Sequence, residues 1–210
     1  MPRPRFHKLT AEKRQQILAA AALEFAEYGF EQASLNRMIR AAEISKGAFY
    51  YYFDDKADLY GTVLTWVVEV ILPRPPPVLQ DLQAETFWPE IETWMMEAAA
   101  NCADRPWLAK LGRQFHHPPP VITDVIANLF RQFGEYLARY MERAQQLCLA
   151  RTDLPDALLL SMLMATLEAS DRWMADNWES LENDQAVQLT QKVMEAARAM
   201  IAPPESGEKG

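Results

Sequence analysis

Apolar residues recur every three or four positions along almost the whole chain, and no segment sustains an alternation of apolar and polar residues. The first spacing places apolar side chains on one face of an α-helix, whereas alternation is typical of a half-buried strand. Glycine, which favours turns and irregular backbone, accounts for only 7 of the 210 residues. The sequence therefore predicts an all-α fold without strands.

Capping residues mark the first helix. Thr10 is placed to cap its start, and Gly29 is expected to stop it in a left-handed conformation, with Phe30 folding back against the last turn. The apolar face expected of this helix consists of Ile17, Ala21, Phe25 and Tyr28.

Two short helices joined by a tight turn follow. Ser34 is placed to cap a helix that runs to Ala42, and Ser45 to cap a second helix that ends near Tyr51. This arrangement is typical of a helix-turn-helix, in which the second helix lies in the major groove of DNA. The residues expected to pack between the helices are Met38, Ile39, Ala42, Ile44, Phe49 and Tyr52.

Prolines divide the rest of the chain. A fourth helix from Lys56 to Leu72 must end there, because Pro73 and the prolines at 75–77 cannot continue it. Five more helices are expected at 88–102, 105–115, 121–149, 155–178 and 183–201, which gives about nine in total. We expect a three-helix DNA-binding domain at 1–55, a larger C-terminal helical bundle at 56–202, and a disordered tail at 203–210.

The formal charge of −8 is unevenly distributed. Residues 1–60 contain 9 Lys and Arg against 8 Asp and Glu, whereas the remainder contains 12 against 21. The acidity therefore belongs to the second part, and it does not exclude DNA binding through a local basic face.

The sequence gives no indication of a membrane span or a secretory signal. The longest apolar stretch, 157–167, is well short of the roughly 20 residues that a span needs. No apolar run follows the basic start of the chain, so we expect a cytoplasmic protein. In that compartment Cys102 and Cys148 are expected to be buried or half-buried thiols and not a disulfide.

The stretch from Ile17 to Leu64, and especially the segment SKGAFYYYFDDK at 45–56, resembles the N-terminal domain of the tetracycline-repressor (TetR) family. The resemblance implies an all-α homodimer that binds a palindromic double-stranded DNA operator and carries an effector site in its C-terminal domain. The family usually has glycine where this chain has Glu43, so Glu43 is expected to adopt a left-handed conformation at a cost of about 1 kcal/mol.

The residues that the resemblance places at or near DNA are Ser34, Arg37, Ser45, Lys46, Gly47, Tyr50, Tyr51 and Lys56. Arg37 and Lys46 are suited to base edges, and Gly47 permits close approach of the backbone. Phosphate oxygens are the better-suited partners of Ser34, Ser45, Tyr50 and Lys56. The basic residues before them, Arg3, Arg5 and Lys8, form either a minor-groove arm or a solvated start.

The second part is rich in Trp, Met and Phe. Most of these residues are expected to be core, but pockets between bundle helices have similar linings, so we hypothesise a small hydrophobic or aromatic effector. The candidate pocket residues are Trp94, Met95, Phe115, Phe130, Phe133, Met164, Glu168 and Trp173. Glu168 would select a cationic ligand if it faced inward, but an exposed or ion-paired carboxylate is the favoured interpretation.

Small residues recur every four positions in the helix expected at 155–178, and such a ridge lets another helix approach closely. A second apolar face lies on the last helix. We expect these faces to meet their two-fold copies in a homodimer. The candidate interface residues are Ala157, Ser161, Ala165, Ala169, Leu189, Val193, Ala197 and Met200.

Enzymatic activity, metal binding and a cofactor are not expected. The chain has no Gly-rich phosphate loop, no G-x-S-x-G elbow, no H-E-x-x-H motif and no cluster with metal-ligand spacing. The favoured function is an effector-released repressor. The alternative is a helical protein-interaction or ligand-binding module without sequence-specific DNA binding.

Overall fold

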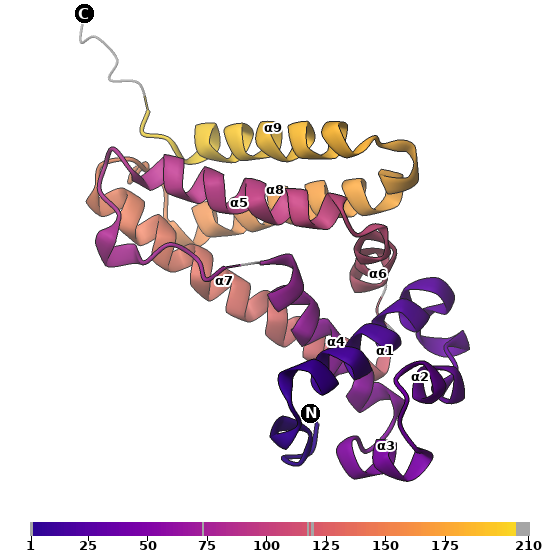
Figure 1. Ribbon diagram of the computed structural model, residues 1–210. Coiled ribbons are helices and arrows are strands. Elements are labelled where there is room, and N and C mark those ends of the chain that lie inside the picture. Colours follow the sequence, from indigo (N-terminus) through magenta and orange to yellow (C-terminus); the bar gives the residue numbers. More distant parts are fainter. Residues whose placement is uncertain (1, 73, 117, 119, 205–210) are drawn as a thin grey trace, which may run out of the picture. The chain divides into compact units, whose positions relative to one another are not determined.

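The computed structural model of the protein describes residues 2–72, 74–116, 118 and 120–204, apart from the side chains at 115, 121 and 183. Within these residues the chain forms nine α-helices, four short 3-10 helices and no strand (Figure 1). The predicted all-α fold of about nine helices, with an N-terminal helix-turn-helix and a C-terminal helical domain, is confirmed.

The chain divides into two compact units. The first unit comprises residues up to 71 together with 105–129, and the second comprises 72–104 and the residues from 130 onward. Each unit therefore contains segments that are distant in sequence. The predicted boundary between residues 55 and 56 stays a prediction, and most of the predicted tail, 205–210, lies outside the described residues.

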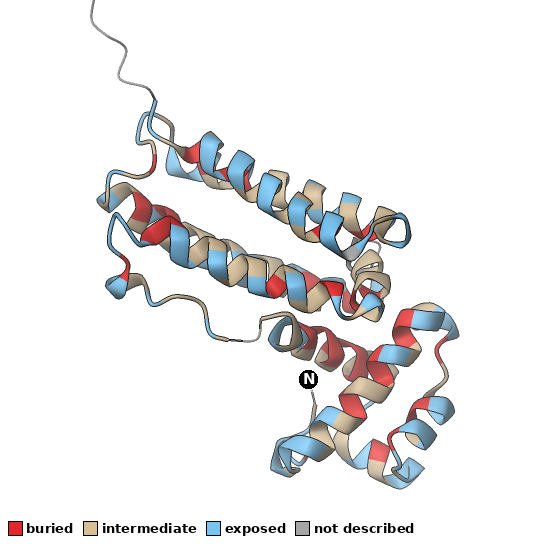
Figure 2. Ribbon diagram, turned by 45° about the horizontal axis from the view of Figure 1, so that its top comes forward, coloured by how far each residue is buried: buried red, intermediate tan, exposed pale blue. Residues whose placement is uncertain are grey.

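The first unit is built on α1 (Ala11–Gln32), which packs against α2 (Leu35–Ala41), α4 (Lys56–Ile71) and α6 (Pro106–His116). The short helix α3 (Lys46–Tyr52) lies between α2 and α4 in the chain. Buried residues concentrate on α1 and α4 (Figure 2). The largest side chains that are less than 2% exposed in this unit include Phe25, Phe49, Phe53 and Tyr60. These aromatic rings form the centre of the unit.

Local sequence sets the ends of these helices. The hydroxyl of Thr10 accepts a hydrogen bond from the backbone N–H of Lys13, as the capping pattern predicts. Gly29 has a positive φ of 70°, but its ψ of 170° is extended and not helical, so α1 is kinked there and continues to Gln32. The predicted stop at Gly29 is therefore a kink. The ring of Phe30 stacks on Phe25 as expected, with centroids 6.2 Å apart.

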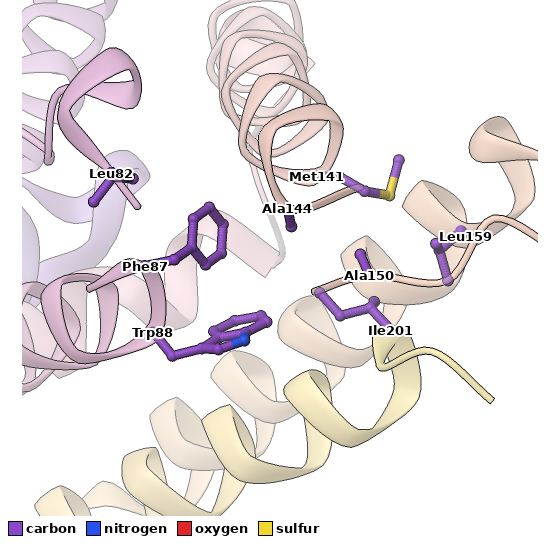
Figure 3. Packing of buried hydrophobic residues seen from close by; sticks show 8 residues of the cluster. All are labelled: Leu82, Phe87, Trp88, Met141, Ala144, Ala150, Leu159 and Ile201. Carbon is purple, nitrogen blue, oxygen red and sulfur yellow. The ribbon is translucent and has the colours of Figure 1, made fainter. Parts of the chain in front are cut away.

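The second unit contains α5 (Phe87–Ala103), most of α7 (Thr123–Gln146), α8 (Asp156–Asn177) and α9 (Asn183–Ile201). Helix α9 packs against both α5 and α8. The buried core of this unit is drawn from these four helices, from the segment before α5 and from the loop after α7 (Figure 3). The residues of this cluster are Leu82, Phe87, Trp88, Met141, Ala144, Ala150, Leu159 and Ile201.

Three local predictions were wrong. Tyr28 does not join the apolar face of α1, because its side chain is 46% exposed. Helix α7 ends at Gln146 and not at residue 149, because the chain turns through Cys148, which has a φ of 59°. That turn also exposes Cys148, whereas Cys102 is half-buried as expected; both thiols are free.

Among the residues described, none of the helices has both the length and the apolar character that a bilayer span requires.

Candidate nucleic-acid interface

Helices α2 and α3 form the predicted helix-turn-helix, and both begin at serine caps. The hydroxyl of Ser34 accepts from the N–H of Arg37 at 3.4 Å, and that of Ser45 accepts from the N–H of Ala48 at 3.0 Å. Because the caps satisfy N–H groups that have no partner within the helix, they set where each helix starts.

The turn between the two helices passes through Glu43 with a φ of 51°, which confirms the left-handed conformation expected there. The ammonium of Lys13 on α1 holds this turn by donating to the carbonyl of Ala42 at 3.0 Å and to that of Glu43 at 3.3 Å. The Glu43 carboxylate also accepts from the amide of Gln16 at 3.3 Å. Contacts with α1 therefore stabilise a turn that lacks the usual glycine.

Helix α3 has one buried side and one exposed side. Phe49 is 1% exposed and packs against Phe53, with ring centroids 5.5 Å apart. On the opposite side Tyr50 and Tyr51 are 45% and 48% exposed. The cap Ser45 and its neighbours Lys46 and Gly47 are exposed as well. The structure thus brings five of the predicted DNA-binding residues together on the exposed side of α3.

Two more predicted residues, Ser34 and Arg37, lie together at the start of α2 and share one partner on α1. The Glu24 carboxylate accepts from the N–H of Ser34 at 2.7 Å and from Nε of Arg37 at 2.8 Å. The Arg37 guanidinium also lies over the ring of Tyr28, 4.2 Å from its centroid. Burial raises the pKa of Glu24, but these hydrogen bonds outweigh it and hold that pKa below its usual range.

Lys56, at the start of α4, binds backbone carbonyls near the end of α1. Its ammonium donates to the carbonyls of Phe30 at 2.7 Å, Glu31 at 3.2 Å and Ala33 at 3.4 Å. It also lies 4.6 Å from the centroid of the Phe30 ring. Lys56 therefore caps the C-terminal end of α1, and its contact with a phosphate stays a prediction.

Sequence reasoning missed the anchoring of the N-terminal residues. Phe6 is 2% exposed and packs on Phe53, with ring centroids 4.9 Å apart. Arg3 donates to the carboxylate of Asp54 and to the carbonyl of Tyr50. In this structure the Arg3 side chain is therefore bound to the protein and not free in solvent. An aromatic residue within a basic start was the only signal in the sequence.

The candidate effector residues do not form a single described site. Trp94, Met95, Phe130 and Met164 are half-buried, and Phe133 and Trp173 are 42% and 51% exposed. Glu168 is exposed and pairs with Arg172 at 2.8 Å, as the favoured interpretation expected. Phe115 lies on α6, and its side chain is outside the described parts.

Two hollows open on the surface of the second unit. One, of about 800 Å³, lies between α5 and α9 and includes Glu92, Met96, Met194 and Arg198 in its lining. The other, of about 260 Å³, lies between α8 and α9. Its lining joins Trp173, a predicted effector residue, to Ala169, Leu189 and Val193 of the predicted dimer interface.

The candidate interface residues differ in exposure. The four small residues of α8 are all exposed, namely Ala157, Ser161, Ala165 and Ala169, and their place in a dimer interface stays a prediction. On α9 the residues Leu189, Val193 and Met200 are half-buried, whereas Ala197 is only 5% exposed. Ala197 therefore packs within its own chain.

Comparison with known proteins identifies the segment that contains the helix-turn-helix. Residues 17–63 match the family model of bacterial regulatory proteins, tetR family. The regulator HbdR of Aromatoleum sp. (strain CIB) is 33% identical over 75 residues, which cover 36% of this chain and 33% of HbdR. The probable acrEF/envCD operon repressor of Escherichia coli (strain K12) is 21% identical over 174 residues, which cover 79% of this chain and 75% of the repressor.

Solved structures extend the similarity to the whole fold. The transcriptional regulator FadR of Bacillus subtilis, in complex with stearoyl-CoA, has a TM-score of 0.74 and 17% identity, and the match covers 89% of this chain and 98% of that one. The family-model match therefore covers the helix-turn-helix of α2 and α3 and parts of α1 and α4, and the fold similarity includes the C-terminal helices. Residues 17–63 therefore carry a domain of the tetR family of bacterial regulatory proteins, and the fold of the chain resembles that of transcriptional regulators.

Proposed function

We propose that the protein is an effector-responsive transcriptional repressor that binds a palindromic operator as a homodimer. The observation that carries this proposal is the exposed side of α3, where Lys46, Gly47, Tyr50 and Tyr51 are exposed while Phe49 is buried. The major groove of DNA admits an α-helix, and the cationic Lys46 can donate to base edges there. Gly47 permits close approach of the backbone. The tyrosine hydroxyls suit phosphate oxygens.

Further contacts come from residues that already hold protein partners. Ser34 and Ser45 lie at the starts of the two helices, and Arg37 and Lys56 reach DNA by exchanging a carboxylate or carbonyl partner for a base edge or a phosphate. Such an exchange keeps each cation paired in both states, so it avoids the cost of an unpaired charge. DNA contact at these positions is part of the same proposal, as is the location of the protein in the cytoplasm.

Dimerisation is proposed through α8 and α9. Leu158 and Met162 of α8 are 48% and 39% exposed, in addition to the row of small residues on the same helix. Exposed apolar surface of this kind marks an interaction site. We assign Trp173 to this interface and not to the effector site, because it lines the hollow shared with Ala169 and Val193. A dimer places two reading helices about 34 Å apart, as a palindrome requires.

The effector is proposed to be a small hydrophobic or aromatic molecule bound among the helices of the second unit. The half-buried Trp94, Met95, Phe130 and Met164 supply apolar surface there. Helix α4 runs directly into this unit at residue 72, so a shift of α4 on effector binding would change the spacing of the two reading helices. FadR was solved with stearoyl-CoA, which makes stearoyl-CoA a rational first probe.

Replacement of both Lys46 and Tyr50 by alanine tests the DNA site. A duplex of about 30 base pairs, long enough for two half-sites, is first enriched from a random pool by the unaltered protein. The double variant is expected to lose binding to this duplex while sedimenting as a dimer. Retained sequence-specific binding would refute the site.

Failure of the unaltered protein to enrich any duplex would favour the alternative, a helical module without sequence-specific DNA binding. Release of the bound duplex by stearoyl-CoA would assign an acyl effector. No release would exclude this acyl effector and leave the DNA site unaffected.

A further inference from the structure

The segment from Arg3 to Lys8, here called the N-terminal strap, is hydrogen-bonded to the C-terminal end of the reading helix through Arg3. The backbone N–H of Arg3 donates to the carbonyl of Tyr52 at 2.8 Å, and its Nη1 donates to the carbonyl of Tyr50 at 2.9 Å. The Arg3 Nε and Nη2 atoms donate to one oxygen of Asp54, at 2.8 and 2.7 Å. These groups belong to the last turn of α3 and to the residues just beyond it.

The strap is also anchored by Phe6 and by backbone carbonyls at its C-terminal end. Phe6 is buried against Phe53 and meets the Tyr52 ring edge-on, with centroids 6.2 Å apart. On α1, Nη1 of Arg14 donates to the carbonyls of His7 at 3.2 Å and Leu9 at 2.6 Å. Because α3 has only seven residues, little of its own hydrogen bonding resists fraying, and the strap supplies external contacts where the helix ends.

Arg5 lies on the same side as the reading surface. Its guanidinium carbon is 4.2 Å from the centroid of the Tyr51 ring, and both side chains are exposed. Arg3 is neutralised by Asp54, whereas the described residues provide no carboxylate within ion-pair distance of Arg5. Arg5 therefore presents an uncompensated positive charge beside Tyr51.

We propose that the N-terminal strap completes the DNA-binding site, with Arg3 as a positioning residue that fixes the end of α3 and Arg5 as a phosphate-contacting residue held in place by Tyr51. This inference rests on the proposed function. It adds two residues that lie more than 40 positions before the reading helix in sequence. It differs from a minor-groove arm, since the strap acts while docked on the protein.

Binding of the enriched duplex, measured between about 50 and 200 mM salt, separates the two roles. Loss of one phosphate contact lowers the steepness of log K against log salt by about 0.9 per protomer, so R5A is expected to show this change. R3A is expected to weaken binding about tenfold, the effect of losing one charge-assisted contact, with an unchanged salt slope because its charge is already neutralised. R3K, which keeps the charge and one donor, is expected to recover part of that loss.

R131A is the matched control, because it removes one exposed arginine from α7 and changes the net charge equally. It should bind the duplex like the unaltered protein. A salt slope for R5A equal to that of R131A overturns the role of Arg5. An R3A affinity equal to that of the unaltered protein overturns the role of Arg3.

If R3A does not fold, R3K decides the question: weakened binding with the original salt slope supports the positioning role, and unchanged binding overturns it. The proposed function fails in a different way, since the unaltered protein would then bind no duplex at all.

Discussion

The hydroxyl of Tyr60 donates a hydrogen bond to Oε1 of Gln114 at 2.8 Å. The amide Nε2 of the same glutamine donates to the carbonyl of Phe25 at 2.6 Å. Three helices, α4, α6 and α1, are therefore joined through one side chain within the first unit. Tyr60 is completely buried, and this burial raises the pKa of its phenol above the usual range, so the hydroxyl remains a donor at all ordinary pH values.

Replacement of Gln114 by leucine is expected to lower the free energy of unfolding by about 1–3 kcal/mol, because two buried polar groups lose their partner. Urea unfolding measures this change. Tyr60→Phe on the leucine background removes one of the unpaired groups, so the double variant should be more stable than the sum of the single effects. If the two substitutions changed the free energy of unfolding additively, the hydrogen bond between Tyr60 and Gln114 would not contribute as proposed.

Gly29 is expected to resist substitution because of its backbone conformation alone. Its φ is 70°, yet among the described residues nothing beyond its neighbours along α1 lies within 4 Å of the position that a Cβ would occupy. Gly29→Ala should therefore lower the free energy of unfolding by about 1–3 kcal/mol through backbone strain. Gly47→Ala is the matched control, since Gly47 is helical and its Cβ would meet only the Ser45 hydroxyl at 3.8 Å. Equal stability losses in the two variants would refute the strain argument.

The sequence was sufficient to predict features that depend on local patterns. Thr10, Ser34 and Ser45 cap helices as expected, and the prolines separate α4 from α5. The contacts of Arg3 were not predictable, because its partners Tyr50 and Asp54 lie 47 and 51 positions away and no periodicity connects them. The same limit applies to Lys56, whose carbonyl partners become accessible only where the kink at Gly29 ends the regular part of α1.

The candidate effector site was the least predictable part. Aromatic and Met residues have the same helical spacing in a core, a pocket and an interface. Trp173 illustrates this limit, since only the structure places it beside Ala169 and Val193.

The ion pair between Glu24 and Arg37 predicts a dependence of stability on acid pH. The Glu24 pKa is lowered in the folded protein, so its stabilising contribution is fully present above the unfolded pKa of about 4.3 and is lost as the pH falls through the folded value. Glu24→Gln removes this contribution. The difference in free energy of unfolding between the two proteins should be larger at about pH 6 than at about pH 3. A difference that is constant over this range would contradict the shift.

The small-residue row of α8 predicts the outcome of a single charged substitution. Ala165 is exposed in the isolated chain, so Ala165→Arg should leave the fold intact but place a large cation in the proposed dimer interface. Sedimentation velocity is expected to show a monomer at concentrations where the unaltered protein is a dimer. Ala127→Arg, on an exposed position of α7, is the control and should remain dimeric.

The salt dependence of duplex binding tests DNA reading by the exposed side of α3 most directly. A DNA-reading dimer should bind the enriched duplex with log K falling linearly as log salt rises, by about 0.9 for each phosphate contacted, and K46A should flatten this slope. Binding that does not change with salt, or a K46A variant with an unaltered slope and affinity, would contradict the assignment of α3 as the reading helix.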